Sequence, residues 1–138
     1  RAIAIAAEAH AGQVDKAGEP YILHPLRVMM ELETTEDRIA GVLHDVVEDN
    51  AAWPLSALRA EGFSDAIIAT VDAVTRREDE DYEAFVRRAA RNQIGRRVKL
   101  ADLADNMKLT RIKTPGPNDH ERMERYRKAQ RILRAAGQ

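Results

Sequence analysis

The sequence predicts an all-α protein, a single globule of roughly seven helices. Only seven Gly and five Pro occur among 138 residues, whereas the strong helix formers Ala, Leu, Arg and Glu are abundant. No stretch alternates apolar and polar residues with the period of two that a half-buried strand requires. The length suits one domain of ordinary size, so we expect residues 1–138 to form a single unit.

Composition narrows the class of protein. Hydrophobic residues make up 44% of the chain and charged residues 33%, the balance of a globular protein in water. Cysteine is absent, which excludes disulfides and thiolate metal sites. No apolar run has membrane-spanning length, so we expect a cytoplasmic protein without a membrane partner. The net charge of −1 gives no support to nucleic-acid binding, and homo-oligomerisation stays open.

The order of helices follows from apolar periodicity and capping residues. Ser64 is suited to cap one helix, and Asn118 with Glu121 resembles the capping box of the last one. Residues 113–118 hold two Pro and one Gly and are expected to form a loop. The expected helices span residues 2–11, 25–33, 36–50, 55–61, 64–75, 81–92, 95–109 and 118–136.

Residues 39–50 are expected to form one continuous helix with two opposed faces. At 100° per residue, His44, Asp45, Glu48 and Asp49 fall within an arc of about 140°, and apolar residues fill the other side. Four neighbouring ionisable groups at the edge of a buried helix repel one another unless a positive charge lies among them. A divalent metal would provide that charge. The alternative is a solvated acidic face, which the adjacent His-Asp pair makes less attractive.

Two further positions complete a candidate ligand set. Asp102 and Asn106 share one face of the helix expected at 95–109, opposite an apolar stripe, and His24 stands before a proline at a helix entrance. Taken singly, Asp102 fits a surface carboxylate and His24 fits a capping or core histidine. Together with His44 and Asp45 they form a set of two imidazoles and two carboxylates. Such a set suits Mn²⁺, Fe²⁺ or Zn²⁺ rather than Ca²⁺.

The order His…His-Asp…Asp resembles the signature of the HD-domain metal-dependent phosphohydrolases. Four segments are also similar to the hydrolase domain of RelA/SpoT proteins and to stand-alone small alarmone hydrolases, and they occur in the same order across residues 2–110. The segments are Ala9–Gln13, Gly18–Pro25, Leu43–Asp49 and Val98–Asp102 followed by Asn106.

The resemblance implies Mn²⁺-dependent removal of the 3′-pyrophosphate from (p)ppGpp. By motif, Glu48 and Asp49 would position and deprotonate the attacking water, Asn106 would contact the nucleotide, and Lys16 would contact a phosphate. His10 is expected to be structural, hydrogen-bonded behind the ligands. With four His in the chain, we expect one metal per chain. The implied metal ligands are His24, His44, Asp45 and Asp102.

Substrate recognition departs from the family pattern at four positions. The alarmone hydrolases usually carry a basic residue where Asp15 stands, Ser near Ala17, Arg at Leu103 and a polar residue at Leu109. These departures leave open an HD phosphohydrolase that acts on another nucleotide, such as a nicotinamide dinucleotide phosphate. They also leave open a non-catalytic nucleotide-sensing module, although a binding module has no need of a water-activating pair.

Overall fold

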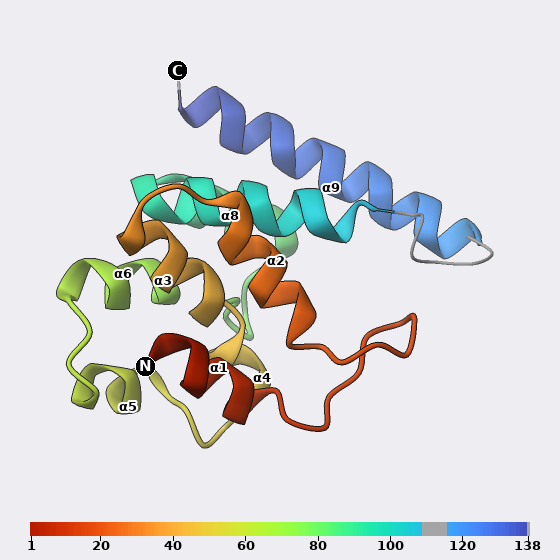
Figure 1. Ribbon diagram of the computed structural model, residues 1–138. Coiled ribbons are helices and arrows are strands. Elements are labelled where there is room, and N and C mark those ends of the chain that lie inside the picture. Colours follow the sequence, from red (N-terminus) through yellow and green to blue (C-terminus); the bar gives the residue numbers. More distant parts are fainter. Residues whose placement is uncertain (109–115, 138) are drawn as a thin grey trace.

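The computed structural model describes residues 1–108 and 116–137 as an assembly of helices (Figure 1). These ranges contain no strand, only an isolated bridge between Val14 and Pro20, so the predicted all-α class is confirmed. The helices are α1 (Ala2–Ala9), α2 (Leu23–Glu31), α3 (Thr35–Leu43), α4 (Val46–Asp49), α5 (Leu55–Ala60), α6 (Asp65–Ala73), α7 (Tyr82–Ala90), α8 (Gln93–Asn106) and α9 (Pro117–Ala136).

Side-chain caps fix where several helices begin. In each case a side-chain oxygen before the first turn accepts a hydrogen bond from a backbone N–H that has no partner within the helix. Ser64 caps α6 in this way, as predicted. The other capping residues of this kind are Thr34 before α3, Asp81 before α7 and Asn92 before α8.

The predicted start of the last helix is wrong. The helix α9 begins at Pro117, one residue before the expected cap at Asn118. Proline suits a first helical position because its missing N–H would have no partner there. The carboxylate of Asp119, rather than that of Glu121, accepts from the backbone N–H of Gly116 at 2.8 Å.

The predicted continuous helix over residues 39–50 is also wrong. α3 ends at Leu43, His44 and Asp45 form a turn, and α4 is a single turn. In a continuing α-helix the carbonyl of Gly41 would accept from the N–H of Asp45. Here it accepts instead from the His44 ring Nδ1–H at 2.7 Å and the His44 backbone N–H at 3.4 Å. The imidazole therefore replaces the bond that would have extended the helix.

The buried apolar side chains of the described ranges form three clusters. The first joins α1, α3, α4, α5 and α6, the second joins α2 and α3 to α7 and α8, and the third joins α7 and α8 to α9. α3 lies at the centre and packs against α1, α2, α6 and α8, whereas α9 lies across α7 and α8 on one side of the molecule (Figure 1). This packing brings α2, the end of α3 and α8 together.

Residues 12–20 form the predicted loop between α1 and α2, and it is held by its own hydrogen bonds. The backbone N–H of Asp15 donates to the backbone carbonyl of Glu19 at 2.9 Å. The backbone N–H of Tyr21 donates to the backbone carbonyl of Gln13 at 2.8 Å. Gly12 and Gly18 have φ values of 81° and 83°, which favour glycine at these turns. Figure 1 shows this loop projecting beneath the start of α9.

Two predictions concern residues outside the described ranges. Leu109, expected to end the α8 helix and to depart from the family pattern, lies there, and so does the part of the expected loop over residues 113–115. Among the helices that are described, none combines the length and apolar character needed to cross a membrane.

Candidate metal centre and nucleotide pocket

Three segments that are far apart in the sequence bring their ligand-type atoms together. Within the described residues, His24 of α2, His44 after α3 and Asp102 of α8 offer atoms that all lie within 4.8 Å of one another, and all three side chains are buried. The Nε2 atoms of the two imidazoles lie 2.9 Å and 3.4 Å, respectively, from Asp102 Oδ1. Asp45 Oδ2 lies 3.1 Å from His44 Nε2 and 3.8 Å from His24 Nε2.

The outer nitrogens of both imidazoles are engaged, which turns the inner nitrogens toward the carboxylates. His44 Nδ1–H donates to the carbonyl of Gly41, and His24 Nδ1 lies 2.7 Å from Asp105 Oδ2. His44 Nε2 is buried and has no hydrogen-bond partner among residues 1–108 and 116–137. A buried ring nitrogen that faces two carboxylates, on a ring oriented by a carbonyl, fits a divalent metal site.

The electrostatics of this cluster depend on the mutual proximity of opposite charges. Burial alone lowers the pKa of His44, but the charges of Asp45 and Asp102 outweigh burial and raise that pKa well above its ordinary value. Burial opposes ionisation of Asp45, yet the adjacent His44 holds its pKa at about 2. Burial also opposes ionisation of Asp102, but the charge of Lys99 holds its pKa well below the ordinary value. Both carboxylates are therefore ionised at neutral pH, the form in which they can bind a cation.

Lys99 and Asn106 both hold the carboxylate of Asp102. Lys99 Nζ donates to Oδ2 at 2.8 Å, and Asn106 Nδ2 donates to Oδ1 at 3.0 Å. Burial alone lowers the pKa of Lys99, but the charge of Asp102 raises it above its ordinary value. Oδ1, the oxygen that faces both imidazoles, is therefore the one that Asp102 offers to the centre of the cluster.

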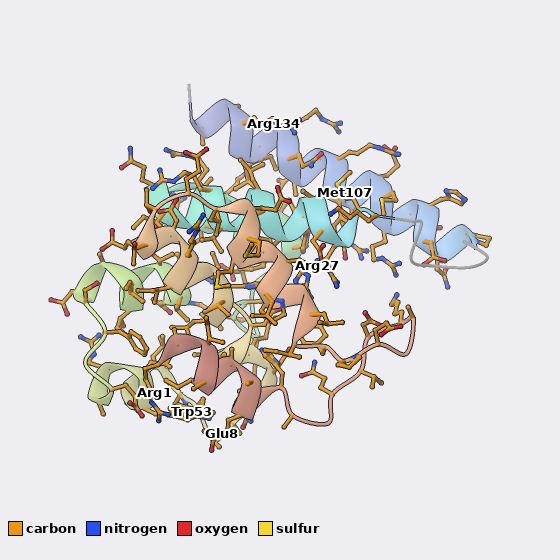
Figure 2. The ribbon with its side chains drawn as sticks, in the orientation of Figure 1. Arg1, Glu8, Arg27, Trp53, Met107 and Arg134 are labelled. Carbon is orange, nitrogen blue, oxygen red and sulfur yellow. The ribbon has the colours of Figure 1, made fainter. Side chains whose placement is uncertain are left out.

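Tyr21 and Arg27 orient the acidic groups around the cluster. The Tyr21 hydroxyl donates to Asp45 Oδ2. Arg27, which Figure 2 labels between α2 and α8, donates from Nε to Asp105 Oδ1 at 2.8 Å. Asp105 in turn orients His24, so a chain of hydrogen bonds runs from the partly exposed guanidinium to the buried imidazole.

The predicted catalytic pair, Glu48 and Asp49, lies on α4, one turn beyond Asp45. Glu48 Oε1 accepts from the backbone N–H of Arg76 at 3.1 Å, and Asp49 Oδ2 accepts from Gln13 Nε2 at 3.2 Å. Burial raises the pKa of each carboxyl above its ordinary value, and the negative charge of Asp45 adds to the effect. A carboxylate with a raised pKa is a stronger base, as proton abstraction requires.

A pocket of about 220 Å³ lies beside the cluster, between the loop over residues 12–20, the end of α8 and the start of α9. The predicted substrate contacts Lys16 and Asn106 both line it. Its basic side chains suit phosphate groups and its two tyrosines offer aromatic surface. The lining residues are Asp15, Lys16, Ala17, Tyr21, Asp105, Asn106, Lys108, Arg122 and Tyr126.

Comparison with known proteins identifies the family. A family model described as HD domain matches residues 2–135. The chain belongs to the HD-domain family. Among its relatives is a probable GTP pyrophosphokinase of Mycobacterium leprae, 34% identical over 131 residues, which covers 83% of this chain and 16% of the relative.

Two further relatives are named guanosine-3′,5′-bis(diphosphate) 3′-pyrophosphohydrolase. The protein from Aquifex aeolicus is 32% identical over 120 residues, covering 78% of this chain and 17% of its own length. The protein from Borreliella burgdorferi is 36% identical over 83 residues, covering 57% and 12%. The predicted resemblance to RelA/SpoT proteins is thus confirmed, and this HD domain spans less than a fifth of the length of these relatives.

Among the described residues, those that depart from the family pattern lie in two different places in this HD domain, at the pocket and in the apolar core. Asp15 and Ala17 line the pocket, and Asp15 Oδ1 accepts from the backbone N–H groups of Ala17 and Glu19 at 2.9 and 3.0 Å. Leu103 is fully buried beneath α9 and does not line the pocket. Asp15 therefore serves the fold of the loop, and Leu103 serves the core.

Sequence reasoning missed several residues of this HD domain. Tyr21 stands within a quoted motif but was expected only as part of an apolar segment, and Lys99 stands beside Asp102 without an expected role. Arg122 and Tyr126, four residues apart on α9, line the pocket from a helix outside the matching motifs. Their i, i+4 spacing placed them on one helix face, but nothing in the sequence indicated what that face meets.

Proposed function

We propose that this chain is a metal-dependent phosphohydrolase that removes pyrophosphate from the 3′ position of (p)ppGpp. The observation that carries the proposal is a pocket with Lys16, Lys108 and Arg122 opening beside the His-Asp cluster. An anionic nucleotide bound there would have its phosphates near the groups that can attack them. The names of the HD-domain relatives supply the substrate class.

In this proposal His24, His44, Asp45 and Asp102 hold one divalent metal. Mixed imidazole and carboxylate donors without thiolate favour Mn²⁺ or a similar transition metal. When bound, such an ion lowers the pKa of water and offsets negative charge at a phosphate. Lys99 and Tyr21 keep Asp102 and Asp45 ionised and oriented toward it.

Glu48 and Asp49 orient a water molecule and accept its proton. The water oxygen forms a bond to the phosphorus attached to the 3′-oxygen, and the bond between that phosphorus and the 3′-oxygen breaks. The 3′-oxygen leaves with a proton, so ppGpp and water give GDP and pyrophosphate. Lys16 contacts a phosphate, and Asn106 contacts the nucleotide near the reacting group while it also holds Asp102.

The test is turnover of a nucleotide panel by protein supplied with Mn²⁺. The panel contains ppGpp, pppGpp, GTP and NADPH, and the products are separated as nucleotide, phosphate and pyrophosphate. We expect pyrophosphate and GDP from ppGpp, and no turnover by His44→Ala. Phosphate release from NADPH alone would favour the alternative substrate class, whereas nucleotide binding without any turnover would favour a sensing module.

A further inference from the structure

A chain of hydrogen bonds connects the end of α1 to the proposed base on α4. His10 Nδ1 lies 2.9 Å from Gln13 Oε1, and Gln13 Nε2 donates to Asp49 Oδ2 at 3.2 Å. Neither His10 nor Gln13 lines the nucleotide pocket or belongs to the buried His-Asp cluster. The three residues come from the end of α1, the following loop and α4, so tertiary packing is needed to connect them.

The chemistry of the three groups fixes the direction of this chain. An ionised carboxylate can only accept, so the amide NH₂ of Gln13 must face Asp49. The amide oxygen then faces His10, and it can only accept as well. His10 therefore carries a proton on Nδ1, the nitrogen that faces Gln13. Consistent with this tautomer, His10 Nε2 is fully buried and has no hydrogen-bond partner in the part of the chain that is described.

Asp49 needs such support because its own helix gives it little. α4 is a single turn, and a quarter of the Asp49 side chain is exposed, at 26%. His10 is rigid by comparison, since its side chain has no exposed surface and its ring lies 5.0 Å from that of Tyr21, centroid to centroid. One amide thus ties the partly exposed carboxylate of Asp49 to the buried ring of His10.

We propose that Gln13, anchored by His10, is a positioning residue that aims the ionised carboxylate of Asp49 at the attacking water. The inference rests on the proposed function, because it assigns Gln13 a part in the proton transfer proposed for Asp49. Gln13 acts through Asp49 and touches neither nucleotide nor metal. Its loss should therefore affect the rate of the chemical step rather than nucleotide binding.

The kinetic test is a double-mutant cycle between Gln13→Met and Asp49→Asn. Methionine keeps the length of the side chain and removes both hydrogen bonds. We expect Gln13→Met to lower kcat about tenfold with KM unchanged, because small misplacements of a catalytic group are costly. In the Asp49→Asn background, Gln13→Met should not lower kcat any further. An equal loss in both backgrounds would overturn the proposal.

The pH profile provides a readout that a merely structural loop residue would leave unchanged. An N–H donated to a carboxylate favours its ionised form and lowers its pKa. Gln13→Met should therefore move the acidic limb of kcat/KM to higher pH. Val14→Ala, a change at an exposed side chain of the same loop, should leave both kcat and the limb where they are. A Gln13→Met profile with an unmoved limb would contradict the proposed link to Asp49.

A measurement without substrate tests the hydrogen-bond chain itself. Nitrogen NMR of the ¹⁵N-histidine-labelled full chain should show His10 as the Nδ1–H tautomer, and Gln13→Met should abolish that preference. A dominant Nε2–H tautomer in the wild type would overturn the proposal. If the tautomer is as expected but the wild type hydrolyses no nucleotide, the proposed function fails and the positioning role fails with it, while the hydrogen-bond chain stands.

Discussion

At the scale of single residues, Asp102 uses its two carboxylate oxygens differently. Oδ1 faces both imidazoles and Oδ2 accepts from Lys99. The Lys99 ammonium also lies 4.8 Å from the centroid of the Phe85 ring, so an aromatic face and a carboxylate both stabilise this buried cation. Each member of this pair depends on the other, because a buried charge without its partner is costly.

Removing Lys99 should therefore destabilise the fold. Lys99→Met leaves Asp102 buried without its cation, and we expect a loss of about 3 kcal/mol in the free energy of unfolding in the presence of a chelator. Mn²⁺ should restore part of the loss by offsetting the same negative charge. Denaturant unfolding with chelator and with Mn²⁺ measures both values. The matched control is Lys128→Met, which breaks an exposed pair with Glu83 and should cost less than about 1 kcal/mol. Equal losses for the two variants would contradict the role given to Lys99.

The proposed ligands and the proposed catalytic pair should separate experimentally. Asp45→Ala should lose metal affinity and activity together, because it removes a ligand. Glu48→Gln should keep the metal and lower kcat about 10²-fold or more, the usual contribution of a positioned base. Elemental analysis of the bound metal and steady-state kinetics of both variants are the measurements. A Glu48→Gln protein that no longer binds Mn²⁺ would show that Glu48 is a ligand.

Residue types explain how much of the candidate site could be predicted from the sequence. His44 and Asp102 were predicted because ionisable side chains lie opposite an apolar stripe, and His24 was predicted because it completes the order of the HD signature. Tyr21 and Lys99 were not assigned roles, because tyrosine and lysine fit many surroundings. Their partners depend on how α2 and α8 are rotated against each other, which packing decides.

At the scale of elements, the break between α3 and α4 shows the same limit. Apolar residues recur with the helical period through Val42 and Val46, so the pattern predicted a single helix. Apolar periodicity indicates which side of a helix faces the core. It does not reveal a side chain that donates a hydrogen bond to a backbone carbonyl. The bond from His44 to Gly41 ends α3 and leaves Glu48 on a separate turn. The expected cap at Ser64 was confirmed because capping is a local interaction, whereas the cap expected at Asn118 was wrong because the helix begins at Pro117.

Arg88 ties the connection between α6 and α7 to both helices. Its guanidinium donates to the carbonyls of Asp72 and Thr75 at 2.9 and 2.7 Å and makes two bonds, of 2.7 and 2.9 Å, to the carboxylate of Glu80. The hydrogen bonds to Arg88 hold the pKa of Glu80 at about 2. The backbone N–H of Arg76, which donates to Glu48, belongs to the same connection, so Arg88 supports the segment that holds the proposed base.

Stability should depend on pH through Glu80. Its pKa is lowered on folding, so its contribution is present above its ordinary value near 4.5 and is lost as the pH falls toward 2. Glu80→Gln should lower the free energy of unfolding by about 1–2 kcal/mol at pH 7 and by much less at pH 3. Urea unfolding at both pH values tests this, with Glu78→Gln, at an exposed position of the same connection, as a control expected to change little. A deficit that is as large at pH 3 as at pH 7 would show that the ionised pair is not its source.

At the scale of the whole molecule, the cluster of His24, His44 and Asp102 lies where separate helices converge. α2 and α8 contribute to the second apolar cluster. α3 contributes to both the first and the second cluster. A metal held by all three segments would add a cross-link between parts of the core that already contact one another through apolar side chains and through polar pairs such as Arg27 with Asp105. Binding to the native state alone would then stabilise the entire fold.

Mn²⁺ should therefore raise the unfolding temperature. At a free metal concentration of about 100 Kd the gain is about 2.7 kcal/mol, or roughly 10 °C in Tm for a domain of this size. Thermal unfolding with Mn²⁺, after chelation and for Asp45→Ala measures the effect, which should be absent in the last two. Elemental analysis should give one ion per chain, and two tightly bound ions would refute the single-site assignment.

The loop over residues 12–20 closes on itself. Its bridge and the carboxylate of Asp15 form hydrogen bonds with backbone groups of the loop itself. Lys16 and Ala17 line the pocket. In the proposed enzyme, the tip of the loop between Val14 and Pro20 would set nucleotide selectivity, whereas Gln13, outside that bridge, supports the base. Replacing residues 15–19 while keeping the bridge and Gln13 would therefore change the bound nucleotide without a redesign of the catalytic groups.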